Sequence, residues 1–236
     1  MLRDKGIGWI TIISIMIYIV IITIGQIIGT TAFTADCIIF VILTLFYYWT
    51  YEKWNMTPII FLLLEIGHIT HALGTFGWYN ISPIPIRWER ITHFIGAMPF
   101  AMLFFNYFKH KWDNKILTRK NLVLALIVFF AALGVGQIVE ASEFWGFQAF
   151  GRGEGAFMFG HGDGIITPEG KEILDVYGGG WINSGWDVTV NTIGVIFGIL
   201  LMSIGQWLFR KKKEEIDLYE LEKLYLKDKK GYSQKF

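Results

Sequence analysis

Six stretches of about 20 mostly apolar residues follow one another along this chain, separated by short polar segments. A helix needs roughly 20 apolar residues to cross the hydrocarbon core of a bilayer, so each stretch is long enough to span a membrane. The apolar residues do not alternate with period two, which argues against membrane-spanning strands. Charged residues make up only 17% of the chain, against about 25% in soluble domains. The sequence therefore predicts an all-α integral membrane protein.

The predicted architecture is one bundle of six transmembrane helices. The expected spans are residues 7–29, 32–49, 58–78, 91–108, 121–144 and 186–209. The second span is the least apolar at its start, because Asp36 lies within its first turns. A Gly-rich extracytoplasmic loop is expected at residues 146–185, either as a plain surface connection or as a lid, and a charged cytoplasmic tail at residues 210–236.

Basic residues in the connections predict the direction of the helices. Clusters at residues 109–120 and 210–213, together with Lys53, Arg3 and Lys5, fall on one side of a six-span bundle. Short loops rich in Lys and Arg remain in the cytoplasm, so both termini are expected to be cytoplasmic and the chain to lie in the cell membrane. The single cysteine, Cys37, excludes an internal disulfide and multi-cysteine metal sites. The net charge of +1 gives no indication of nucleic-acid binding.

Polar residues gather toward the outer ends of the predicted helices. They come from four separate stretches of the chain: Glu65, His68 and His71; Arg90 and His93; Gln137, Glu140 and Glu143; Asp187 and Asn191. A charge at a helix centre costs about 2.5–3.5 kcal/mol on insertion scales, so such side chains should face one another or a wet cavity. Gly194 and Gly198 continue the stripe of Asp187 and Asn191 and would let another helix approach closely. We therefore predict one polar chamber that opens to the outside.

Imidazoles and carboxylates in one chamber suit a divalent metal ion such as zinc, iron or manganese. Glu65 and His68 have the i, i+3 spacing that di-metal helix bundles use. The predicted metal ligands are Glu65, His68, His71 and His93, the candidate catalytic residues are Glu140, Glu143, Asp187 and Arg90, and Gln137 and Asn191 are predicted structural polar residues. In a metal-dependent enzyme, Glu140 or Glu143 would accept a proton from a bound water. The alternative is an ion-pair network, for example Arg90 with Glu140 or Asp187, that only locks the bundle.

Three short motifs resemble those of the YjdF-like and VanZ-like membrane proteins. Residues 88–96 (WERITHFIG) are similar to the aspartate-arginine/lysine-x-x-histidine-phenylalanine signature of these families, with Glu89 where aspartate is usual. Residues 139–145 (VEASEFW) resemble the glutamate pair of the YjdF-like group, and residues 185–194 (GWDVTVNTIG) the aspartate–asparagine–glycine start of the last helix in both. The motifs follow the family order and cover about residues 65–200, although the Gly-rich insertion before Trp186 is longer than usual.

The resemblance implies a multi-pass membrane protein with six shared polar positions. These are Arg90, His93, Glu140, Glu143, Asp187 and Asn191. VanZ-like proteins are linked to glycopeptide-antibiotic tolerance, which suggests an envelope or lipid-linked substrate but supplies no reaction.

The expected function is to bind or act on an amphiphilic or lipid-linked envelope molecule, in contact with membrane lipids. An ion or proton transporter is an alternative, but a permeation path should continue polar residues inward, and residues 100–105 and 195–202 are largely apolar. A non-catalytic subunit of a membrane complex, contacted through the charged tail, is a third reading. The oligomeric state is left open.

Overall fold

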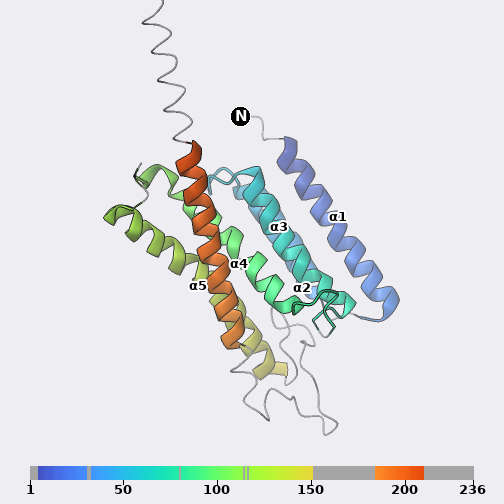
Figure 1. Cartoon of the computed structure of the whole chain (residues 1–236). Coiled ribbons are helices and arrows are strands. Elements are labelled where there is room, and N and C mark those ends of the chain that lie inside the picture. Colours follow the sequence, from blue (N-terminus) through green and yellow to red (C-terminus); the bar gives the residue numbers. More distant parts are fainter. Residues whose placement is uncertain are drawn as a thin grey trace, which may run out of the picture.

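A computed structural model of the chain describes residues 5–30, 33–79, 81–113, 115, 117–150 and 184–209. These residues form α-helices and contain no strand, which confirms the all-α prediction (Figure 1). The helices are α1 (Lys5–Ile28), α2 (Thr34–Thr50), α3 (Pro58–Ala72), α4 (Trp88–Tyr107), α5 (Arg119–Phe150) and the unlabelled Ser184–Phe209 helix, with short 3-10 helices η1 (Leu73–Phe76) and η2 (Lys109–Lys111).

Four of the helical segments are long and apolar enough to cross a membrane. They are Gly6–Ile28, Pro58–Phe76, Arg119–Ser142 and Ser184–Phe209. Helix α2 is apolar but has only 17 residues, so it is shorter than the four. Helix α4 has 20 residues but is also not one of the four. The multi-pass character is thus supported, while six crossings and cytoplasmic termini stay predictions.

Local geometry explains the two ends of α3, which lie close to the predicted ends, whereas α5 is longer than predicted. Helix α3 begins at Pro58, whose missing N–H costs nothing at this position, and the Thr57 side chain accepts a hydrogen bond from the Ile60 amide at 3.3 Å. Its continuation ends at Gly77, which has a left-handed φ of 76°. Helix α5 continues to Phe150 and so occupies the first residues of the predicted loop. Residues 151–183 and the tail from residue 210 lie outside the described residues.

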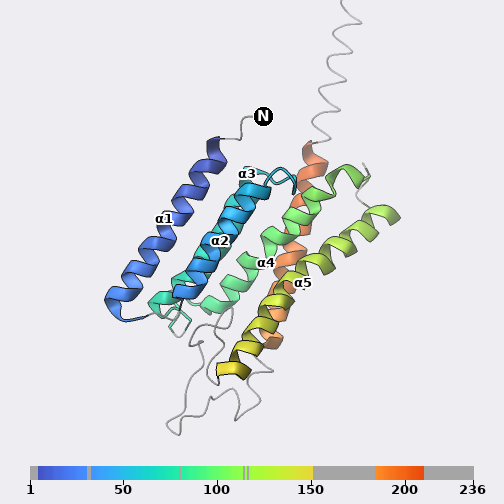
Figure 2. The ribbon, with the colours of Figure 1, turned by 180° about the vertical axis from the view of Figure 1, so that it is seen from behind.

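Helix α4 lies in the middle of the bundle and joins two packed groups of helices (Figures 1 and 2). On one side Met98 and Leu103 pack with Phe61 of α3 in an apolar cluster that also includes residues of α1 and α2. On the other side Ala101 packs in a second cluster with Val195 of the Ser184–Phe209 helix and residues of α5. The start of α1 and the end of the Ser184–Phe209 helix lie at the same end of the bundle.

The predicted close approach of the last helix involves the backbone of α4. A Cβ atom added at Gly194 would lie 2.6 Å from the Phe94 carbonyl oxygen, and one added at Gly198 would lie 2.6 Å from that of Met98. Two glycines one turn apart therefore allow the two helices to touch through their backbones. This contact fixes how deep Asp187 and Asn191 sit beside α4.

The outward faces of the helices carry large apolar side chains. Exposed residues of this kind run along α1 and α5 and along the Ser184–Phe209 helix, for example Ile12, Ile19, Leu126, Phe130 and Ile196. Helices that are apolar on both their packed and their outer faces are typical of proteins surrounded by lipid.

Candidate functional site

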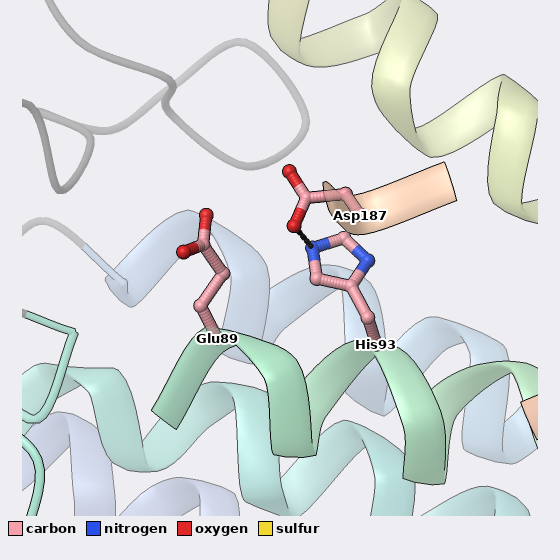
Figure 3. A group of neighbouring side chains, drawn as sticks. All are labelled: Glu89, His93 and Asp187. Carbon is pink, nitrogen blue, oxygen red and sulfur yellow. Dashed lines mark ion pairs between the residues drawn. The ribbon is translucent and has the colours of Figure 1, made fainter. Parts of the chain in front are cut away.

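His93 of α4 lies at the meeting point of three helices. Its Nε2 is 3.3 Å from Oδ1 of Asp187, and its Nδ1 is 3.3 Å from Oδ1 of Asn191, both on the Ser184–Phe209 helix. From α5, Oε1 of Glu140 comes within 3.7 Å of Nδ1. The His93 side chain is 14% exposed and that of Asp187 only 3%, so the imidazole and the carboxylate meet largely away from solvent. Figure 3 shows the His93–Asp187 pair.

The amide of Asn191 selects the tautomer of His93. An amide oxygen accepts a hydrogen bond and cannot donate one, so Nδ1 of His93 carries the proton. Nε2 then meets the Asp187 carboxylate at 3.3 Å in one of two ways: with a second ring proton, which makes the contact an ion pair, or with its lone pair, in which case a cation between the two acceptors would offset their repulsion. A second ring hydrogen bond that orients the metal-binding nitrogen is the usual arrangement around metal-bound histidines.

The spacing between Nε2 and the carboxylate fits a tetrahedral metal ion. Zinc binds imidazole nitrogen and carboxylate oxygen at about 2.0–2.2 Å, which puts two ligands of one ion roughly 3.3–3.5 Å apart. The observed separation between His93 and Asp187 is 3.3 Å. The pair therefore already has the ligand–ligand distance of such a site.

Glu89 supplies a third donor from the same face of α4. It precedes His93 by one helical turn, and ligand atoms of Glu89, His93 and Asp187 all lie within 4.8 Å of one another (Figure 3). The sequence analysis placed Glu89 in a motif but not among the ligands. The i, i+4 spacing of Glu89 and His93 is the signal that could have identified it.

Glu140 completes the surroundings of the imidazole. The residue is 9% exposed, and its Oε1 has no hydrogen-bond partner within the described part of the chain. A buried carboxylate oxygen without a donor is costly, unless a cation or a proton compensates it. We name Glu89, His93, Glu140 and Asp187 the His93 cluster.

A cavity of about 310 Å³ adjoins the His93 cluster. Its polar lining includes Glu89, His93 and Asn191, and its walls come from α2, α3, α4 and α5. Apolar and aromatic residues make up most of the walls, among them Phe33, Phe40, Leu43, Tyr47, Leu64, Phe100, Val135 and Ile138. The space is thus a mainly apolar pocket with a few polar groups, the usual composition of a small-molecule site.

Two further predicted ligands, His68 and His71, also line this cavity, but their rings contact aromatic side chains and not the carboxylates near His93. The His68 ring stacks on Phe40 at 4.7 Å and is parallel to Tyr47 at 5.9 Å between centroids. Nδ1 of His71 lies 2.7 Å from the Tyr79 hydroxyl. Neither histidine joins the His93 cluster, so the predicted set of three converging imidazoles is divided between the cluster and the cavity wall.

Glu65, the fourth predicted ligand, points to a different interface. Its Oε2 lies 3.1 Å from the Tyr18 hydroxyl of α1 and 2.8 Å from Oγ1 of Thr44 in α2. The carboxyl is therefore held between α1, α2 and α3 and does not border the cavity lined by His93. The cavity therefore brings together His68, His71, His93 and Asn191 of the predicted chamber, whereas Glu65 lies at a separate polar site.

The remaining predicted site residues, Arg90, Gln137 and Glu143, do not belong to the His93 cluster. The Arg90 guanidinium lies over the ring of Trp186 at 4.4 Å, a cation–π contact that ties the start of α4 to the start of the Ser184–Phe209 helix. Gln137 is exposed and does not border the cavity. Glu143 lies in α5, but its side chain is outside what the structure describes.

Comparison with known proteins identifies a family but no closer relative. A family model described as "Predicted membrane protein (DUF2238)" matches residues 7–207. That range includes every described helix that contributes to the His93 cluster. No curated protein and no solved structure matches the chain.

Proposed function

The chain belongs to the DUF2238 family of predicted membrane proteins, and we propose that it binds a divalent metal ion at the His93 cluster. The observation that carries the proposal is the 3.3 Å separation of His93 Nε2 and Asp187 Oδ1, with Asn191 oriented to hold the proton on the opposite ring nitrogen. Glu89 adds a carboxylate, and the ligand atoms of Glu89, His93 and Asp187 lie within 4.8 Å of one another. One imidazole with two or three carboxylates suits zinc, iron or manganese.

The proposal includes an amphiphilic molecule as the ligand of the adjoining cavity. The aromatic and aliphatic walls would hold an apolar tail, while Glu89, His93 and Asn191 lie where its polar group would meet the metal. A divalent ion held by Glu89, His93 and Asp187 would activate a bound water as a nucleophile near neutral pH. The carboxylate of Glu140, next to the His93 ring, is positioned to accept a proton in that case.

The setting of the site supports a ligand taken from the membrane. Helix α4 and the Ser184–Phe209 helix contribute residues from their first turns, at the end of the bundle away from the start of α1 (Figures 1 and 2). Basic residues cluster at the other ends of these helices, so the positive-inside rule favours the outer leaflet of the cell membrane for the site. The motif order supports a YjdF-like relationship, and together with a VanZ-like one it would favour an envelope or lipid-linked molecule.

Elemental analysis of the detergent-purified protein tests the metal directly. We expect about one zinc, iron or manganese ion per chain, because the His93 cluster offers enough donors for a single ion. Metal-free preparations should regain that ion when zinc or manganese salt is titrated in a calorimeter. A protein that carries no metal and takes up none in the titration would contradict the proposal.

Filling the cavity tests the amphiphile separately. A Cβ atom at Gly96 meets nothing within 4 Å, and Gly96 lines the cavity, so Gly96→Leu should extend a side chain into it without straining α4. Overpacking a filled site costs about 1–3 kcal/mol, which corresponds to roughly 5- to 150-fold weaker binding. The measurement is the affinity for a fluorescent fatty acid, cis-parinaric acid, in detergent, together with mass spectrometry of co-purified lipid.

The matched control for this variant is Gly134→Leu. Gly134 is an exposed glycine of α5, and an added Cβ there also meets nothing within 4 Å. We expect Gly134→Leu to bind the probe as the wild type does and both variants to keep the metal. Equal probe binding by Gly96→Leu and the wild type would remove the cavity from the proposal.

A further inference from the structure

Glu65 is a buried acid outside the His93 cluster, and none of the described basic residues forms an ion pair with it. The residue is 1% exposed and lies on the apolar helix α3. Its Oε1 is buried and makes no hydrogen bond of ordinary geometry among the residues described, although the Ser14 hydroxyl of α1 also lies close to the carboxyl. An ionised carboxylate in such a place costs several kcal/mol, so the group must be either protonated or paired with a bound cation.

The number of protons on the hydroxyl groups around Oε2 indicates whether Glu65 is protonated or paired with a cation. Oγ1 of Thr44 lies 2.8 Å from Glu65 Oε2 and 2.7 Å from the Phe40 carbonyl oxygen, and both of these distances require a shared proton. The threonine hydroxyl has only one proton to donate. If it donates to Phe40, as its i−4 position favours, the proton between Thr44 and Glu65 must belong to Glu65. The Tyr18 hydroxyl at 3.1 Å can still donate to the same carboxyl oxygen.

We infer that Glu65 is a proton-binding site in the interior of the bundle and that it exchanges its proton with the cavity through His68. This site is independent of the proposed metal function, because none of its residues belongs to the His93 cluster. The ligand is a proton taken from water in the cavity, and the acid is neutral once it is bound.

His68 is the titratable group that connects Glu65 with the cavity. It follows Glu65 by three residues on α3, which places the two side chains on neighbouring positions of one helix face. His68 lines the cavity, and its Nδ1 is buried without a hydrogen-bond partner in the described structure. The other titratable groups close to Glu65 are Tyr18 of α1 and Tyr47 of α2. Neither tyrosine is expected to ionise near neutral pH.

Infrared spectroscopy of the full chain in detergent tests the proton at Glu65. We expect the wild type at neutral pH to show the C=O stretching band of a protonated carboxylic acid and Glu65→Gln to lack that band. Because glutamine has the shape of the neutral acid, Glu65→Gln should also keep the thermal midpoint of the wild type. The matched control is Asp36→Asn, which removes another buried acid of α2 and should leave the Glu65 band in place.

Two further variants keep the test decisive if Glu65→Gln does not fold. Thr44→Val removes the acceptor of the Glu65 proton and should shift the band to higher frequency. His68→Phe keeps the aromatic stack with Phe40. In D₂O the carboxylic-acid band shifts when deuterium replaces the Glu65 proton. We expect this shift to be absent from His68→Phe after the time that the wild type needs to exchange fully. The inference is overturned if the band is absent from the wild type, persists in Glu65→Gln, or is unmoved in Thr44→Val. Normal exchange in His68→Phe overturns the route through His68, and stabilisation by sodium that only the wild type shows overturns the proton in favour of a cation.

Discussion

His93→Ala is expected to yield a purified protein without bound metal, whereas the wild type retains about one ion per chain. The imidazole is the only nitrogen donor of the cluster, and both of its ring nitrogens are engaged, at 3.3 Å from Asp187 and at 3.3 Å from Asn191. Its loss leaves carboxylates alone, which hold zinc or iron far less well than a site with imidazole. Elemental analysis and zinc titration of the two proteins side by side provide the measurement.

Two other variants separate loss of a ligand from loss of the fold. His110→Ala changes an exposed histidine beyond the opposite end of α4 and should leave the metal content unchanged. Asn191→Ala keeps all the proposed ligands but releases Nδ1 of His93, and we expect roughly 10–100-fold weaker metal binding from the loss of such an orienting partner. Full metal content in a folded His93→Ala protein would refute the site.

Gly194→Leu is expected to separate the Ser184–Phe209 helix from α4 and to destabilise the protein strongly. An added Cβ would lie 2.6 Å from the Phe94 carbonyl oxygen, a backbone atom that no side-chain rotation can move away. Overpacking costs about 1–3 kcal/mol even where side chains can adjust, so a rigid backbone clash should cost at least that much. The thermal midpoint of the detergent-solubilised protein should fall, and metal binding should weaken because Asp187 and Asn191 move with their helix.

Gly205→Leu is the matched control for this substitution. Gly205 lies on the same helix, three turns further along, and a Cβ atom there meets nothing within 4 Å. The Gly205→Leu protein should therefore have a thermal midpoint close to that of the wild type. If Gly194→Leu and Gly205→Leu melt alike, the glycine contact does not hold the two helices together.

The helices could be predicted from the sequence because each apolar stretch is long enough to determine its own structure. The contact partner of each polar side chain could not be predicted, because a helix face that is known from periodicity can pack against any of several neighbouring helices. Glu65 and His68 share one face of α3, yet Glu65 meets Tyr18 and Thr44 while His68 borders the cavity. Only the packing of α1 and α2 against α3 distinguishes the two environments.

The three-residue spacing of Gln137, Glu140 and Glu143 predicts a shared helix face that is wider than the buried face of α5. A step of three residues turns an α-helix by about 300°, so two such steps rotate a side chain by roughly 120° from the first position. Gln137 and Glu143 are two steps apart, and Gln137 is exposed while Glu140 between them is buried. His93, Asp187 and Asn191 were easier to predict, because Gly194 and Gly198 indicate which stripe of the last helix packs closely.

The absence of a side chain at Gly136 gives α5 a part in orienting His93. A Cβ atom there would lie 3.0 Å from Nδ2 of Asn191, so the amide that orients His93 rests directly on the surface of α5. Rotation or sliding of α5 would therefore turn that amide and, through it, the imidazole. If the His93 cluster binds an ion as proposed, a change in bilayer thickness or tension that tilts α5 would alter the affinity of the cluster for that ion.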